Sequence, residues 1–357
     1  MRVITQIPNH DLVEAQTVAR LAERCGFDAI VTAENAHNPF LPLAAAALVT
    51  DRIELGTAVA IAFPRSPTIT AHVAWDVHLA SKGRFNLGLG AQVKQHNERR
   101  YGLTWTPPAP RMRDYIGAVR AVWRAWETGE KLDYRSDTYT LTLTTPNFAP
   151  KPNRLPPIPI SLATVGPAML RLAGEVADGA RLHPFSTKRY LAEVSNTRIA
   201  EGLAKSGRQR QNIEFIAGGY GFIGTGRDAE AVAKALAYVR FRIAFYCSTR
   251  AYWDVLRLHD LEWLGETVNP LPRENRWEKM KTIIPEEYID LFATVTDYEA
   301  LPAAIEKRYG GLADTVLLQI SADEDIDRLT ACVRAIQQIP TPFAGYKLTP
   351  YKAAAAG

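Results

Sequence analysis

The sequence of 357 residues contains only three cysteines and no long apolar segment. Cys25, Cys247 and Cys332 are far apart and form no C-x-x-C pair, which argues against a disulfide framework and a cysteine metal site. The longest apolar run, Leu43 to Val49, is far shorter than the roughly 18 residues of a membrane span. The first residues, up to Pro8, lack the apolar middle of a secretory signal. We therefore expect a cytoplasmic protein that is not bound to a membrane.

The sequence also lacks an excess of charge of either sign. It has 42 basic and 38 acidic side chains, a formal net charge of +4, whereas nucleic-acid-binding proteins present a dense basic surface. No H-E-x-x-H, G-x-S-x-G or Walker sequence occurs, and His72 and His78 would lie on different faces of a helix. We expect no nucleic-acid partner and no metal, which leaves organic-cofactor chemistry or simple ligand binding.

What the sequence does have is a regular alternation of short β-branched runs and helical patterns. Asp11 and Glu14 are spaced like a capping box at the start of the first helix. The expected strands cover residues 2–7, 29–33, 53–61, 85–91, 158–164, 179–183, 214–224 and 315–321. The expected helices cover residues 11–25, 41–49, 68–81, 111–126, 167–177, 189–205, 228–244 and 323–339.

Eight strands that alternate strictly with helices predict a parallel sheet, and eight is the number that closes a barrel. The alternative, an open doubly wound sheet, requires a glycine-rich turn after the first strand, but Gln6 to His10 contains no glycine. We therefore predict an α/β fold, a (β/α)8 TIM barrel forming one domain over residues 1–339. Insertions are expected near 127–157, as a hairpin and connector, and near 245–310. The tail, residues 340–357, has no predicted structure.

In such a barrel, chemistry belongs at the carboxyl ends of the strands. Glu34, Asn35 and His37 follow the second strand and offer a carboxylate, an amide and an imidazole. A polar loop that only caps the next helix is an equally good interpretation. Near the end of the fourth strand, Gly88 and Gly90 leave the backbone bare for a ligand, or form a simple bend in the strand.

The turn after the fifth strand is a further candidate. Thr164, Val165 and Gly166 precede Pro167, a residue that fits the first turn of a helix. The free backbone N–H groups of such a helix start can bind a phosphate. Every barrel helix has an amino end, however, so an ordinary helix start is the alternative.

Several segments resemble the bacterial-luciferase-like superfamily of flavin and deazaflavin oxidoreductases. The resemblance is strongest to its branch dependent on coenzyme F420, a deazaflavin hydride carrier, and covers nearly the whole chain. The segments that carry it are CGFDAIVTAEN (25–35), RIELGTAVA (52–60), KGRFNLGLGAQVKQHNERRYG (82–102), SLATVGPAMLRLAGEVADG (161–179) and RYGGLADTVLL (308–318).

The resemblance implies a (β/α)8 barrel with a non-proline cis peptide bond between Ala58 and Val59. It also implies that the turn after the fourth strand contacts the ring and side chain of the cofactor, and that Ala163 to Gly166 seats its phosphate. The implied cofactor-binding residues are Ala58, Val59, Gly88, Gly90, Ala91, Gln92, Val93, His96, Ala163, Thr164, Val165 and Gly166.

One position departs from the pattern of the superfamily. Relatives often have a carboxylate followed by a histidine at the end of the second strand, whereas here Glu34 is followed by Asn35. An asparagine cannot transfer a proton at neutral pH, which leaves His37, Glu34 or solvent as the proton source. Glu34, Asn35 and His37 are the candidate catalytic residues. Weaker candidates for substrate contact are Arg181, His183, Tyr220, Gln319 and Ser321.

The leading functional hypothesis is an F420-dependent oxidoreductase that acts on a small organic substrate. An FMN-dependent two-component monooxygenase and a non-catalytic flavin-binding barrel are the alternatives. The segment from Phe40 to Val49 is apolar on nearly all faces, which predicts a homodimer or coverage by an insertion. The aromatic segment from Tyr252 to Trp277 would cover the mouth of the barrel or pack on its rim.

Overall fold

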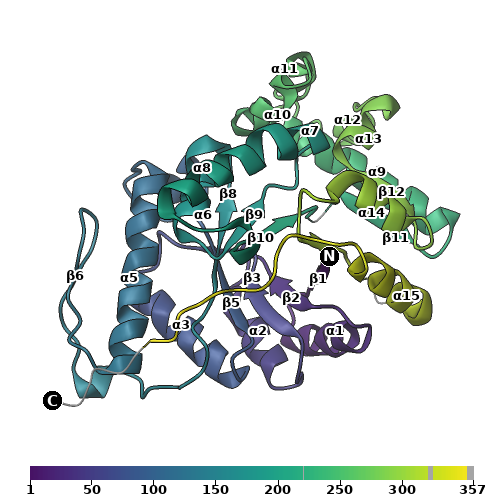
Figure 1. The fold of residues 1–357 in the computed structure, drawn as a ribbon. Coiled ribbons are helices and arrows are strands. Elements are labelled where there is room, and N and C mark those ends of the chain that lie inside the picture. Colours follow the sequence, from purple (N-terminus) through teal and green to yellow (C-terminus); the bar gives the residue numbers. More distant parts are fainter. Residues whose placement is uncertain (220, 321–324, 352–357) are drawn as a thin grey trace.

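The computed structural model describes residues 1–219, 221–320 and 325–351. Within these residues, eight parallel strands form a closed ring (Figure 1). The ring closes because β3, the first strand in the sheet order, also pairs with β5 near the other end of that order. The ring strands are β1 (Arg2–Gln6), β2 (Ala29–Thr32), β3 (Glu54–Thr57), β5 (Phe85–Gly90), β8 (Ile160–Thr164), β9 (Gly179–Leu182), β10 (Glu214–Ala217) and β13 (Thr315–Leu317). The predicted (β/α)8 barrel is confirmed, and the open sheet is excluded.

Helices surround the barrel and bury the apolar core between themselves and the strands. The outer helices are α1 (Leu12–Arg24), α2 (Phe40–Ala47), α3 (Pro67–Ala80), α5 (Pro108–Thr128), α6 (Gly166–Val176), α8 (Asn196–Ser206), α14 (Leu301–Tyr309) and α15 (Ile326–Gln337). As the capping pattern predicts, α1 begins after Asp11, whose carboxylate accepts hydrogen bonds from the N–H groups of Val13 and Glu14. No helix in the described ranges is long and apolar enough to span a bilayer.

The expected strand over residues 214–224 is wrong in its length. β10 ends at Ala217, and Gly218 and Gly221 then adopt positive φ angles of 61° and 82°, which glycine allows without a steric penalty. The chain turns there, and β11 (Ile223–Gly226) leaves the barrel to pair with β12 (Thr294–Asp297) in a separate parallel sheet. The short helix α4 (Lys94–Arg99), which follows β5, was also not predicted.

Both expected insertions contain regular structure. The first holds an antiparallel hairpin, β6 (Tyr134–Arg135) with β7 (Thr140–Leu141). The second follows α9 (Ala229–Cys247) and holds α10 (Trp253–Arg257), α11 (Glu262–Val268), α12 (Trp277–Met280) and α13 (Ile289–Phe292), drawn green in Figure 1. These helices and α9 share an apolar cluster with Phe185 and Phe222. The division into one domain and a tail stays a prediction.

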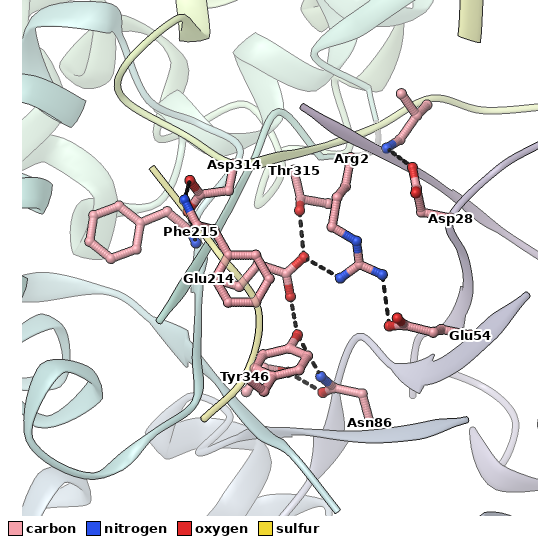
Figure 2. A network of polar contacts seen from close by, with 12 residues as sticks. Arg2, Asp28, Glu54, Asn86, Glu214, Phe215, Asp314, Thr315 and Tyr346 are labelled. Carbon is pink, nitrogen blue, oxygen red and sulfur yellow. Dashed lines mark hydrogen bonds and ion pairs between the residues drawn. The ribbon is translucent and has the colours of Figure 1, made fainter. Parts of the chain in front are cut away.

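The amino end of the barrel interior is lined by charged and polar side chains. Arg2 on β1 lies between two carboxylates: its guanidinium is 2.8 Å from Glu214 on β10 and 2.7 Å from Glu54 on β3 (Figure 2). Thr315 on β13 donates a further hydrogen bond to Glu214. These contacts tie four strands of the ring together at the end opposite the candidate site.

The tail, for which no structure was predicted, completes this polar layer. Residues 340–351 of the tail cross the amino end of the barrel, drawn yellow in Figure 1, and place Tyr346 beside Glu214 and Asn86 (Figure 2). The Tyr346 hydroxyl donates to Glu214 and accepts a hydrogen bond of 2.9 Å from Asn86. Asn86 in turn accepts from Ser161, whose hydroxyl accepts from Arg181 on β9.

Candidate active site

Small residues line the carboxyl end of the barrel where β3, β5 and β8 meet. The peptide bond between Ala58 and Val59 is cis, as expected, and the short strand β4 (Ala60–Ile61) resumes pairing with β5 after it. A Cβ atom on Gly90 would lie 2.5 Å from Cγ2 of Val59 and 3.7 Å from Cβ of Ala163. A residue with a side chain at position 90 would therefore clash with Val59, which already occupies that space. The result is a surface of small apolar groups, which suits a flat ring.

Gly88 precedes Gly90 by two residues on β5, and different neighbours require a glycine there. A Cβ atom there would lie 1.8 Å from the carbonyl oxygen of Thr57 and 2.9 Å from Nε of Arg181. Arg181 thus points into the barrel interior, where its Nε donates to Ser161 over 2.8 Å. The backbone at Gly88 is covered by these neighbours, so packing explains this glycine and no ligand is needed to explain it.

The Glu34 carboxylate, a candidate catalytic group, is already engaged by neighbouring donors. Its Oε2 accepts hydrogen bonds of 2.7 Å from the Ile61 N–H and from Nη1 of Arg65, and its Oε1 accepts one of 2.8 Å from Nη2 of Arg65. The backbone N–H of Glu34 donates to the carbonyl of Val59 over 3.2 Å. Glu34 therefore holds the same segment that carries Val59.

Asn35 and His37 lie on the exposed loop after β2. The Asn35 side-chain oxygen accepts hydrogen bonds from Nδ2 of Asn9 and from the Ala36 N–H, at 3.0 and 2.6 Å. Both partners are donors, so the oxygen must face them and the Asn35 NH2 group is turned away from them. Asn9 was not predicted as a site residue. It orients Asn35 through a contact between the loop after β1 and the loop after β2.

The turn after β5 is held by a buried residue that the sequence did not single out. The Asn97 side chain donates hydrogen bonds of 2.9 and 3.1 Å to the carbonyls of Ala91 and Val93. Gln92 has a positive φ angle of 57°, and His96 on α4 is exposed. Asn97 therefore fixes the conformation of the segment that was predicted to contact the cofactor.

The turn after β8 presents the start of a helix without a side-chain cap. α6 begins at Gly166, one residue earlier than predicted, and Val165 before it makes no capping hydrogen bond. The first N–H groups of a helix have no partner within it and attract anions. A cavity of about 30 Å³ borders Thr164, Val165 and Gly166, and the buried Ser186 hydroxyl beside it has no partner within the described residues.

His183 lies at the end of β9, next to that cavity, within a group of aromatic rings. It stacks on Tyr252 at 4.2 Å between ring centroids, and the Tyr246 ring meets it edge-on at 4.8 Å. Burial lowers the pKa of His183 to about 3, so the ring is neutral at neutral pH. Because Nδ1 accepts from the Phe185 N–H, the proton sits on Nε2. His183 is therefore a hydrogen-bond donor there and not an acid.

The aromatic segment and the remaining candidates for substrate contact lie in different places. Tyr252 borders the cavity, whereas Trp263 and Trp277 of the same aromatic segment are exposed. Gln319 is exposed, and Tyr220 and Ser321 lie outside the described residues. Among the described side chains, no three His, Cys, Asp or Glu residues are grouped to hold a metal ion.

Comparison with known proteins identifies the family. Residues 3–315 match the family described as luciferase-like monooxygenase, and the chain belongs to this family of oxidoreductases. The uncharacterized protein Rv1360 of Mycobacterium tuberculosis is 43% identical over 311 residues, which cover 87% of this chain and 91% of that protein. The 5,10-methylenetetrahydromethanopterin reductase of Archaeoglobus fulgidus is 28% identical over 327 residues, covering 90% and 92%.

Solved structures with the same fold include proteins that use either of two cofactors. The coenzyme F420 dependent tetrahydromethanopterin reductase of Methanopyrus kandleri has a TM-score of 0.75 at 20% identity, covering 95% of this chain and 97% of that one. The oxygenating constituent of 3,6-diketocamphane monooxygenase of Pseudomonas putida, in complex with FMN, has a TM-score of 0.64 at 15% identity, covering 95% and 97%. At these identities the likeness shows the fold alone.

Proposed function

We propose that the chain is a coenzyme F420-dependent oxidoreductase that transfers a hydride between the deazaflavin ring and an organic substrate. The observation that carries this proposal is the surface of small residues at the barrel mouth, where Val59 covers Gly90 beside Ala163. A flat tricyclic ring needs such a surface. The Mycobacterium tuberculosis protein Rv3520c, named putative coenzyme F420-dependent oxidoreductase and 33% identical over 295 residues, supports the deazaflavin over other rings.

The residues at the mouth suit different parts of this cofactor. Ala58, Val59, Gly90 and Ala163 would contact the ring, and the segment from Ala91 to Val93, with His96, would contact its side chain. The uncapped start of α6 at Gly166 would bind its phosphate through backbone N–H groups. When bound, the deazaflavin supplies the hydride carrier, and the protein supplies position and polar contacts.

The groups after β2 and β9 would handle the substrate. The outward NH2 group of Asn35 would donate a hydrogen bond to a substrate oxygen, since Asn9 and Ala36 fix the direction of the amide. The neutral His183 would donate from Nε2. His37, exposed on the loop, or solvent would exchange the proton that accompanies the hydride.

Turnover tests the proposal and separates it from the two alternatives. The purified protein, mixed with F420 in its oxidised and reduced forms and with a panel of alcohols and ketones, should change the visible absorbance of the cofactor. Oxygen-dependent turnover with reduced FMN would instead favour the monooxygenase, an activity that the description of the matching family supports. Binding without any turnover would favour the non-catalytic barrel. Asn35, which stands where relatives often have a histidine, supports this alternative.

We also propose that the protein is a cytoplasmic homodimer joined through α2. Leu41 on this helix and Leu48 at its C-cap are 59% and 75% exposed, and Ala44 and Ala45 between them are partly exposed. The spacing of these four residues places them on one face of the helix. A second copy of the chain would cover this apolar stripe.

A further inference from the structure

We propose that Glu34 and Arg65 act together as a positioning pair that fixes the backbone from Val59 to Ile61 under the cofactor, and that Glu34 is not the proton donor. This inference rests on the proposed function, because it assigns roles at the same site. The sequence predicts Glu34 as a catalytic candidate, and no sequence pattern indicates a role for Arg65.

Glu34 and Arg65 bind both backbone polar groups of Ile61 and the backbone carbonyl of Val59. The Ile61 N–H donates to Oε2 of Glu34 over 2.7 Å, and the Ile61 carbonyl accepts from Nη1 of Arg65 over 2.9 Å. The Val59 carbonyl accepts from the Glu34 N–H over 3.2 Å. The two side chains therefore hold Ile61, and the backbone of Glu34 holds Val59 at the other end of the segment.

The geometry of the pair is that of a two-pronged arginine–carboxylate contact. Nη1 and Nη2 of Arg65 reach Oε2 and Oε1 of Glu34 over 2.7 and 2.8 Å. The side chains of Arg65 and Glu34 are only 18% and 10% exposed. A lysine carries the same charge but cannot form two parallel bonds and also reach the Ile61 carbonyl.

These contacts leave the Glu34 carboxylate little capacity for proton transfer. Three N–H donors occupy three of the roughly four lone-pair sites on its two oxygens, which leaves one site, on Oε1, for a further contact. A group that exchanges a proton in each cycle needs an oxygen free to approach the substrate. Glu34 instead keeps Val59 in place, and Val59 covers Gly90 at the ring surface.

The experiment compares Glu34→Gln, Arg65→Lys and the double variant with the full-length wild-type chain. Arg113→Lys is the matched control, since Arg113 contacts Glu175 over 2.6 Å in an ion pair outside the candidate site. Deuterium exchange of the peptide covering residues 58–65 is measured without cofactor. The dissociation constant for F420 and the pH profile of turnover are then measured on the same proteins.

The positioning role predicts that both single variants raise exchange in residues 58–65 and leave the rest of the chain unchanged. It predicts that each raises the F420 dissociation constant about tenfold, that the double variant is no worse, and that the pH profile keeps its shape. Arg113→Lys should match the wild type in all three measurements. If the wild-type protein binds no F420, the proposed function fails, while the exchange result still stands or falls by itself.

Three results would overturn the inference. Glu34→Gln could abolish turnover and remove one limb of the pH profile while Arg65→Lys behaves as wild type, which would make Glu34 the proton-transfer group. Exchange in residues 58–65 could stay unchanged in Arg65→Lys. Exchange could also rise throughout the chain, or a variant could fail to fold, and the pair would then be a general element of the fold.

Discussion

Tyr346 and Glu214 lie 132 residues apart in the sequence and share a hydrogen bond inside the amino end of the barrel. The carboxylate also contacts Arg2 and Thr315, so the tail completes the set of partners around a buried charge (Figure 2). A buried charge is stable only when its partners are complete. The described part of the tail therefore packs against the amino end of the barrel through Tyr346.

Replacement of Tyr346 by phenylalanine should destabilise the protein. The ring would stay, but Glu214 would lose one donor, and a buried charged group left short of a partner costs about 2 kcal/mol. Urea unfolding at pH 7 measures the change. Tyr288→Phe is the control, because within the described residues the Tyr288 hydroxyl makes no hydrogen bond. Equal stability of the two variants would show that the tail contact does not matter.

The pH dependence of stability should report the ionisation of Glu214. Burial alone would raise the pKa of Glu214, but Arg2, Thr315 and Tyr346 together lower it below its usual value. Its contribution to stability is therefore complete above the unfolded pKa of about 4.3 and is lost as the pH falls through the folded value.

Glu214→Gln tests this sign directly. At pH 7 the variant should be less stable than the wild type by about 3 kcal/mol, because Arg2 loses its buried partner. The difference should shrink as the pH is lowered from 5 to 3.5, since only the wild type then loses a charge. Urea midpoints across this range measure it. A difference that stays constant or widens toward acid would contradict the assigned direction of the pKa shift.

Gly90 and Gly88 should respond differently to an added methyl group. In Gly90→Ala the new Cβ would push Val59 aside and weaken F420 binding about tenfold, since overpacking costs ~1–3 kcal/mol. Val59→Ala in the same chain should restore part of the affinity. In Gly88→Ala the Cβ would collide with the Thr57 backbone, and the protein should not fold. Unchanged F420 binding in Gly90→Ala would contradict the ring surface assigned to this position.

Charged substitutions in the apolar stripe of α2 test the proposed homodimer. The wild-type protein should sediment as a dimer at micromolar concentration, and Leu41→Glu with Leu48→Glu should sediment as a monomer. Leu143→Glu is the control, because Leu143 is 82% exposed and lies outside α2. A wild-type protein that sediments as a monomer would rule out the proposed homodimer.

The barrel could be predicted because it follows from local signals repeated along the chain. β-branched runs, helical patterns and the Asp11 cap all act over a few residues. The strand over 214–224 failed because its apolar pattern continues through Gly218 and Gly221, and the pattern does not show that these glycines turn the chain.

The contacts that define the site could not be predicted in the same way. Glu34 and Arg65 are 31 residues apart, and their pairing depends on how two loops meet at the barrel mouth. A carboxylate in a sequence looks the same whether it transfers a proton or holds a backbone. The glycines were likewise ambiguous until the structure placed Val59 over Gly90 and Arg181 beside Gly88.

Equilibrium titration of the purified full-length protein with F420 and, separately, with FMN distinguishes the proposed cofactor from its alternative. We expect a dissociation constant for F420 in the micromolar range or below, at least one hundredfold lower than for FMN. Binding of F420 should also weaken in Gly90→Ala. Micromolar binding of FMN with none of F420 would contradict the proposed function.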